Sequence, residues 1–141
     1  MSEYICVDAS FVVRFLTSPP TETVYREYWQ RWQENQKEII APTLLYYELT
    51  NALYRLKQAE ILTEDEAQIA LEDALKLDIH LKGEITLHLQ AVTLARRFEL
   101  PATYDAHYLA VAEQFQAEFF TGDKRLFYRV QSQFPKIYLI T

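Results

Sequence analysis

The sequence predicts an α/β fold, a three-layer α/β/α sandwich with a central parallel sheet of four to five strands. Short apolar runs with strand character alternate along the chain with longer segments of helical periodicity. This alternation favours parallel strands joined by right-handed crossovers, with helices on both faces of the sheet. No linker, repeat or low-complexity segment interrupts it, so we expect residues 1–141 to form one domain.

The chain opens with an apolar strand over residues 4–7 that ends abruptly at Asp8, and a short helix is expected over residues 11–16. The next helix follows Ser18-Pro19-Pro20 and runs to about residue 36. Its aromatic residues recur at spacings of three, four and seven, which places them on one helix face. They are Tyr25, Tyr28, Trp29 and Trp32. We expect this face to pack on the sheet, rather than to stay partly exposed for a protein partner.

Residues 38–41 form the second expected strand, and Pro42 closes it. Thr43 is expected to cap the helix over residues 43–59. Thr63 and Glu66 form a capping box at the start of the following helix, which runs to about residue 75. The rest of the chain continues the alternation: an edge strand at 77–82, helices at 86–99 and 104–115, a strand at 117–121, a helix at 124–130 and a last strand at 137–140.

Composition excludes several classes of function. There are only two glycines, Gly83 and Gly122, so a glycine-rich phosphate loop cannot be formed. The single cysteine, Cys6, lies inside the first strand and is expected to be a buried thiol. The formal charge of −6 argues weakly against a nucleic-acid binder. With no apolar run of membrane-spanning length and no signal segment, a cytoplasmic location is the default expectation.

Four carboxylates stand out by their position. Asp8 and Asp123 end strands, while Glu48 and Asp105 lie in the first turns of helices. In a parallel sheet these positions share one edge, so all four are expected to meet there. Each one alone is more simply explained as a helix cap, a dipole-complementing charge or a solvated residue. Together they would repel one another unless they were protonated or a cation neutralised them, and Mg²⁺ or Mn²⁺ suits oxygen ligands.

Neighbouring polar residues are candidates for supporting roles. Ser10 and Thr121 could orient a carboxylate, although capping is an equally good explanation. Asn51 shares a helix face with Glu48 at a spacing of three, so it could contact a phosphate or instead be a core-facing amide. The basic residues that could line this edge are Arg14, Arg55, Lys57, Lys124, Arg125 and Arg129, of which Arg55 and Lys124 are preferred for RNA binding. His107 is expected to point away from this edge of the sheet.

Four motifs, in this order, resemble a PIN domain of the kind found in ribonuclease toxins of prokaryotic toxin–antitoxin pairs (VapC-like). They are Val7-Asp8-Ala9-Ser10, the run from Ala41-Pro42 to Tyr47-Glu48-Leu49-Thr50-Asn51-Ala52-Leu53, Tyr104-Asp105-Ala106-His107-Tyr108-Leu109-Ala110-Val111-Ala112, and Thr121-Gly122-Asp123-Lys124-Arg125-Leu126. The resemblance covers nearly the whole chain. The family usually has alanine where this chain has Gly122, a departure that we expect to loosen the turn.

The resemblance implies a Mg²⁺- or Mn²⁺-dependent endoribonuclease whose catalytic and metal-binding acids are Asp8, Glu48, Asp105 and Asp123. Asp8, Glu48 and Asp105 would bind the metal directly, and Asp123 would bind a second ion or orient its water. An antitoxin partner that inserts a basic residue among the acids, and homodimerisation, are further implications. The alternative is a PIN-like module that binds without catalysis. Two other classes are excluded. A receiver domain requires a pair of acids after its first strand and a lysine after its last, and an Asp-x-Asp phosphatase requires a second aspartate at the position of Ser10.

Overall fold

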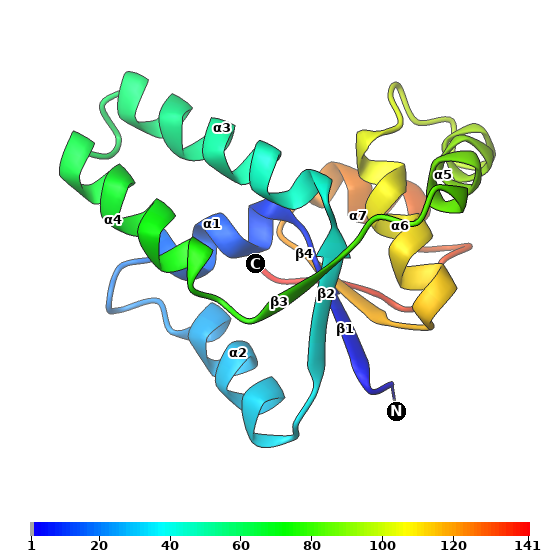
Figure 1. Ribbon diagram of the computed structural model, residues 1–141, viewed down its shortest axis with the longest axis horizontal. Coiled ribbons are helices and arrows are strands. Elements are labelled where there is room, and N and C mark those ends of the chain that lie inside the picture. Colours follow the sequence, from blue (N-terminus) through cyan, green and yellow to red (C-terminus); the bar gives the residue numbers. More distant parts are fainter. Residues whose placement is uncertain (1) are drawn as a thin grey trace.

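The structure, a computed structural model, describes residues 2–141 and is a three-layer α/β/α sandwich, as predicted (Figure 1). A five-stranded parallel sheet forms the middle layer. In chain order the elements are β1 (Tyr4–Val7), α1 (Ala9–Thr17), α2 (Val24–Glu34), β2 (Glu38–Pro42), α3 (Leu44–Gln58), α4 (Glu64–Leu75), β3 (Ile79–Lys82), α5 (Thr86–Arg97), α6 (Tyr104–Phe115), β4 (Glu118–Thr121), α7 (Lys124–Val130) and β5 (Ile137–Leu139).

The strand order is β3-β2-β1-β4-β5, so β1 is the central strand, as predicted. The chain moves outward from β1 to β3, and then crosses to the other side of β1 to add β4 and β5. Helices α1 to α4 therefore cover one face and α5 to α7 the other (Figure 1). Ligand sites in such sheets lie where the strand order reverses, at the carboxyl ends of the strands. Here that point lies between β1 and β4.

Strand register brings the ends of β1 and β4 together. Val7 pairs with Phe120, so the next residues of the two strands, Asp8 and Thr121, lie side by side. The predicted edge strand is also confirmed, since β3 pairs with β2 and has a largely exposed burial pattern. This geometry follows from apolar strand sequences that end in polar residues at the same edge.

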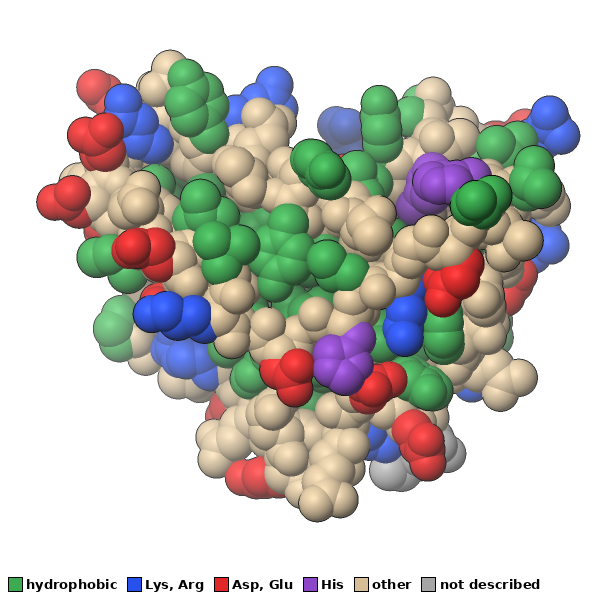
Figure 2. Space-filling model, in the orientation of Figure 1, with side chains coloured by type: hydrophobic (Ala, Val, Ile, Leu, Met, Phe, Trp, Pro, Cys, Tyr) green, Lys and Arg blue, Asp and Glu red, His purple; other side chains and the backbone are tan. Residues whose placement is uncertain are grey.

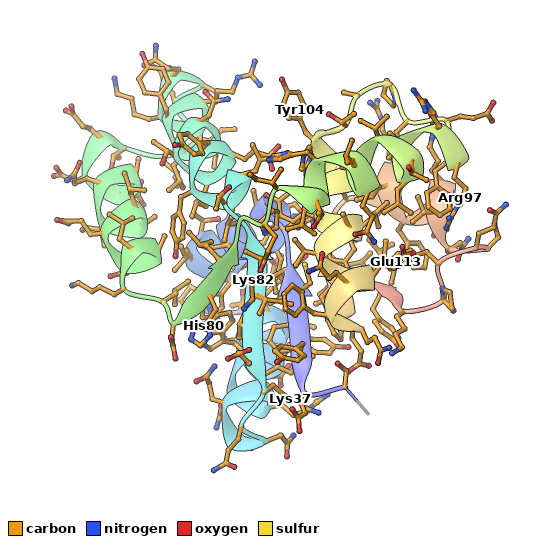
Figure 3. All side chains as sticks on the ribbon, turned by 45° about the vertical axis from the view of Figure 1, so that its right-hand side comes forward. Lys37, His80, Lys82, Arg97, Tyr104 and Glu113 are labelled. Carbon is orange, nitrogen blue, oxygen red and sulfur yellow. The ribbon has the colours of Figure 1, made fainter. Side chains whose placement is uncertain are left out.

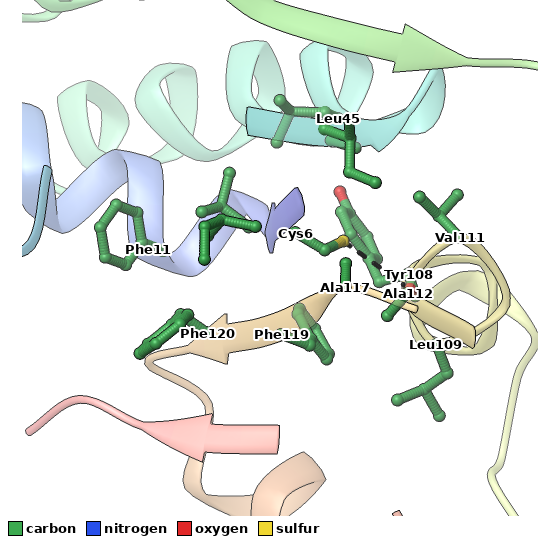
Figure 4. Close-up of a cluster of buried hydrophobic side chains, with 14 of the residues drawn as sticks. Cys6, Phe11, Leu45, Tyr108, Leu109, Val111, Ala112, Ala117, Phe119 and Phe120 are labelled. Carbon is green, nitrogen blue, oxygen red and sulfur yellow. Dashed lines mark hydrogen bonds between the residues drawn. The ribbon is translucent and has the colours of Figure 1, made fainter. Parts of the chain in front are cut away.

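The core fills both faces of the sheet, and Figure 4 shows part of it around Cys6, which is fully buried as predicted. The aromatic face of α2 packs inward: the ring of Trp32 lies 4.9 Å from Phe120 and 5.3 Å from Phe11. Tyr25 is buried as well. The preferred explanation of this stripe is therefore confirmed for Tyr25 and Trp32, while Tyr28 and Trp29 pack against the core and stay partly exposed.

Two predicted helix starts had different outcomes. The capping box at Thr63 and Glu66 forms with both of its hydrogen bonds. Thr43, however, has helical dihedral angles and makes no side-chain capping bond, so that prediction was wrong. The reason is that β2 still pairs with β3 at Pro42 and Lys82, and the Thr43 N–H donates to the carbonyl of Lys82 (3.3 Å). Within residues 2–141, every helix is too short or too polar to cross a membrane.

Candidate active site

One pocket of about 510 Å³ at the carboxyl edge of the sheet holds all four predicted acids. It lies between α1, α3, α6 and the start of α7. The notch between α3 and α6 at the top of Figure 2 lies in this region. The pocket is lined by Asp8, Ala9, Ser10, Val13, Arg14, Glu48, Asn51, Ala52, Arg55, Leu56, Asp105, Tyr108 and Asp123. We refer to it as the acid pocket.

Asp8 is the most enclosed of the acids, with 6% of its surface exposed. It caps α1, and its Oδ1 accepts hydrogen bonds from the Phe11 N–H (3.0 Å) and the Ser10 hydroxyl (2.6 Å). The Thr121 hydroxyl donates to Oδ2. Burial raises the pKa of Asp8, these hydrogen bonds oppose the rise, and the charge of Asp123 adds to it. The residue thus caps a helix and lines the acid pocket at the same time.

Ser10 and Thr121 connect the ends of β1 and β4 through Asp8. Besides donating to Asp8, the Ser10 hydroxyl accepts from the Gly122 N–H (2.9 Å). The Thr121 hydroxyl likewise accepts from the Asp123 N–H (3.0 Å). The side-chain caps of α1 and α7 are Asp8 and Asp123. The two hydroxyls therefore have the geometry of groups that orient a carboxylate.

Glu48 is held by a residue from another element. The Tyr108 phenol donates to Glu48 Oε1 over 2.6 Å. Tyr108 is 1% exposed, and its ring stacks on Phe119 with an interplanar angle of 4°. Burial first, and then the charge and hydrogen bond of Glu48, raise the pKa of Tyr108 well above its usual value, so the phenol is a donor at neutral pH. Figure 4 shows Tyr108 standing beside Cys6 in the core.

Asp105 lies in the first turn of α6, next to Tyr104, which is labelled in Figure 3 at the end of α6 that faces α3. The residue is exposed overall. Partial loss of hydration raises the pKa of Asp105 to about 6, and the charges of Asp123, Asp8 and Glu48 contribute in that order. Burial and the charges of the other three acids thus both favour the protonated form of Asp105, as expected for a carboxyl group that shares a pocket with other acids.

The predicted stripe on α3 reaches the acid pocket as expected from its spacing. Glu48, Asn51, Ala52 and Arg55 all line it. Asn51 is exposed, so the explanation of a core-facing amide was wrong. Lys124 is exposed at the start of α7 and is not among the described residues that line the acid pocket.

Two contributions were missed or ranked too low from sequence. Tyr108 was given no role at the site, although it follows Asp105 by three positions and thus shares its helix face. Arg14 was ranked below Lys124, yet Arg14 lines the acid pocket. His107 points elsewhere, as predicted: its Nε2 contacts His88 Nδ1 at 2.9 Å.

The donor set can be tested for its fit to a metal ion. Among residues 2–141, no three His, Cys, Asp or Glu side chains converge closely enough to hold an ion by themselves. The four carboxylates instead line the walls of one pocket. Mg²⁺ usually keeps several waters and is bound through one or two carboxylates, so carboxylates spread in this way fit it. Such a cation would neutralise the negative charges of Asp123, Asp8 and Glu48, which together with burial raise the pKa of Asp105.

The chain belongs to the PIN domain family, because the family model matches residues 5–132. The family resemblance carried by the four motifs is therefore confirmed. No curated protein matches the chain.

Solved structures that share the fold include VapBC2 from Rickettsia felis bound to a DNA fragment from their promoter (TM-score 0.70, 13% identity, covering 97% of this chain and 97% of that one). A toxin–antitoxin complex from Klebsiella pneumoniae has a TM-score of 0.64 and 15% identity over 96% of this chain and 99% of that one. Mycobacterium tuberculosis VapC20, a sarcin–ricin loop cleaving toxin, has a TM-score of 0.63 and 16% identity over 92% and 95%.

Proposed function

We propose that this protein is a metal-dependent endoribonuclease that hydrolyses RNA phosphodiester bonds, and that it is the toxin of a toxin–antitoxin pair. The observation that carries the proposal is the placement of Asp8, Glu48, Asp105 and Asp123 in one pocket at the switch point of the sheet. Membership of the PIN family and the described activity of VapC20 support it.

Asp8, Glu48 and Asp105 would hold Mg²⁺ or Mn²⁺, at least one of them through a water of the ion, because no three carboxylates converge within residues 2–141, and Asp123 would bind a second ion or orient its water. When bound, the ion would activate water and neutralise charge that develops on the phosphoryl group and the leaving oxygen. Carboxylate oxygens are the ligands that both ions prefer. Asn51 and Arg55 on the α3 wall would contact the substrate phosphates.

The residues around the acids fix the orientation of the carboxylates before substrate arrives. Ser10 and Thr121 hold both oxygens of Asp8, and Tyr108 holds one oxygen of Glu48. Hydrogen bonds of this kind typically tune ligand geometry and basicity. Because the donors lie on α1, β4 and α6, which pack in the core, the acid pocket is preorganised rather than assembled by the substrate.

An RNA cleavage assay with Mg²⁺ or Mn²⁺ tests the nuclease proposal. Asp105→Asn and Asp8→Asn should each lower cleavage at least about 100-fold, because each removes a charge needed to hold the cation. Asp105 is exposed and asparagine also caps helices well, so both variants should fold. Asp73→Asn, an exposed substitution on α4, is the matched control.

Cleavage that persists in EDTA, or in both active-site variants, would contradict the mechanism. If the wild type binds RNA but never cleaves it, the alternative of a catalytically inactive PIN-like binding module is favoured instead. The toxin part has its own test: expression should arrest growth of the host, and co-expression of an adjacent small open reading frame should restore it. Unchanged growth in both cases would contradict it.

A second copy of this chain and an antitoxin are the protein partners that we propose. Ile85, Leu89 and Val92 recur along one face of α5 and are 83%, 74% and 37% exposed, which supports a homodimer through that face. The antitoxin proposal draws on the Klebsiella pneumoniae complex, with a basic antitoxin side chain expected among the acids. A toxin that acts on cellular RNA would work in the cytoplasm.

A further inference from the structure

The side chain of Arg14, on α1, lies across Gly122 at the end of β4. A Cβ added at Gly122 would stand 3.1 Å from Arg14 Nη1, 3.2 Å from Cζ and 3.3 Å from Cδ. Gly122 does not have a positive φ, so the backbone does not require glycine at this position. Instead, the guanidinium occupies the room beside Gly122, so an added methyl group would make the Arg14 side chain shift by a few tenths of an ångström. The expected loosening of the turn stays a prediction, although the space beside Gly122 is filled.

The guanidinium is anchored on one side and open on the other. Arg14 Nη1 donates to the Tyr25 hydroxyl (3.1 Å), which itself donates to the carbonyl of Ile140 (2.9 Å). Arginine carries five N–H donors in a planar fork. Among residues 2–141, Arg14 forms no ion pair with a carboxylate although it shares the acid pocket with four of them. Its remaining donors are thus available to a ligand.

Arg14 also lies at the junction of two cavities. It lines the acid pocket and, with Thr17, Ser18 and Tyr25, the adjoining cavity between α1 and α2. A nucleic acid strand with one phosphate among the acids can continue past this junction. The four acids of the acid pocket are left to a cation, while the Arg14 guanidinium is left to an anion. Glu22 and Glu27 also line the cavity between α1 and α2, so the phosphate is expected beside the guanidinium at the junction and not deeper in that cavity.

We propose that Arg14, accommodated by Gly122, binds the RNA phosphate next to the one that is cleaved. This inference rests on the proposed nuclease function. A guanidinium can bind a phosphate through two parallel hydrogen bonds, which a lysine cannot reproduce. Gly122 would then be the residue that allows this chain to place an arginine beside its acids.

Steady-state cleavage of a labelled single-stranded RNA tests the inference. Arg14→Ala should raise KM about tenfold or more while kcat changes little, because hydrogen bonds to charged groups contribute on that scale to binding. The KM of Arg14→Lys should fall between those of the wild type and Arg14→Ala. Arg31→Ala, at an exposed position in the last turn of α2, removes the same charge away from the acid pocket and is the matched control.

Gly122→Ala provides an independent variant that leaves Arg14 in the sequence but displaces its side chain. It should raise KM like Arg14→Ala, and the double variant should be no worse than Arg14→Ala alone, because both changes remove one interaction. A KM for Arg14→Ala equal to that of the wild type or of Arg31→Ala would overturn the inference, and so would additive effects in the double variant.

The failure of the inference can be told apart from the failure of the nuclease proposal. If the wild type cleaves no RNA, the nuclease proposal fails, and fluorescence anisotropy with the same RNA then decides the role of Arg14. A Kd weakened about tenfold in Arg14→Ala and in Gly122→Ala supports phosphate binding. Equal Kd values, or no binding by any of these proteins, overturn it.

Discussion

The Tyr108 phenol donates a 2.6 Å hydrogen bond to Glu48 Oε1, and this bond joins α6 to α3 across the acid pocket. The donor is fixed by the core, since Tyr108 is buried and stacked on Phe119. The acceptor lies on the wall of the pocket. A buried side chain therefore controls the direction of a carboxylate that would hold a cation, which links core packing to the proposed chemistry.

Tyr108→Phe should keep the ring packing and release Glu48. Cleavage should fall about tenfold or more, as is usual when a group that orients a metal ligand is removed. The free energy of unfolding should fall by only about 1 kcal/mol. The measurement is kcat at saturating RNA and Mg²⁺, together with urea denaturation.

Tyr46→Phe is the matched control for this variant. It also removes a phenol hydrogen bond, here to the carbonyl of Ala74 (3.0 Å), but Tyr46 does not line the acid pocket. It should lose similar stability and no activity. Equal cleavage by Tyr108→Phe and Tyr46→Phe would show that the bond to Glu48 has no catalytic role.

The raised pKa of Asp105 predicts how the stability of the metal-free protein depends on pH. Its folded-state pKa is about 6, above the ordinary value of 3.8, so the folded protein binds this proton more tightly than the unfolded chain. The contribution to stability is therefore present below the unfolded pKa and is lost as the pH rises through about 6. The pKa of Asp8 is also raised, and its contribution has the same sign.

Urea denaturation in EDTA between pH 4.5 and 7.5 measures this dependence. Asp105→Asn should be more stable than the wild type at pH 7 and should lose less stability over that range. Mg²⁺ should stabilise the wild type more than it stabilises the variant. If the two proteins respond identically to pH and to Mg²⁺, the carboxylates do not interact as described.

The hydroxyl of Thr121 is hydrogen-bonded both to the side chain of Asp8 and to the backbone of Asp123. Thr121→Val keeps the shape of this fully buried side chain but removes the donor to Asp8 and the acceptor of the Asp123 N–H. The free energy of unfolding should fall by about 1–3 kcal/mol, because buried polar groups lose their partners. Thr121→Ser keeps the hydroxyl and should retain more of both stability and cleavage. A valine variant as stable and active as the serine variant would contradict this role.

Sequence reasoning predicted the position of the candidate site because it needed only rules that apply to single strands and helices. A carboxylate that follows a strand must lie at the carboxyl edge of a parallel sheet, which placed Asp8 and Asp123. Helical spacing then predicted that Asn51 and Arg55 would accompany Glu48. Both inferences needed only the type of each element and the order of the strands near β1.

The contacts that sequence reasoning missed depend on how separate elements pack. The bond from Tyr108 to Glu48 spans 60 positions and joins helices that lie on opposite faces of the sheet, so it depends on how α3 and α6 are placed at the carboxyl edge. The same holds for Arg14, whose place is decided by the missing side chain at Gly122, 108 positions further along the chain. No periodicity within one element contains this information.

The exposed face of α5 predicts self-association. Leu89 is 74% exposed between Ile85 and Val92 on that face, so Leu89→Lys should place a charge inside a dimer interface and weaken the dimer at least about tenfold. Analytical ultracentrifugation over a concentration series measures the equilibrium. Leu75→Lys is the matched control, because Leu75 is 63% exposed on α4, on the other face of the sheet. A monomeric wild type, or equal effects of the two lysines, would exclude α5 as the interface. Retained single-turnover cleavage by the monomeric variant would further show that one copy of the chain contains a complete acid pocket.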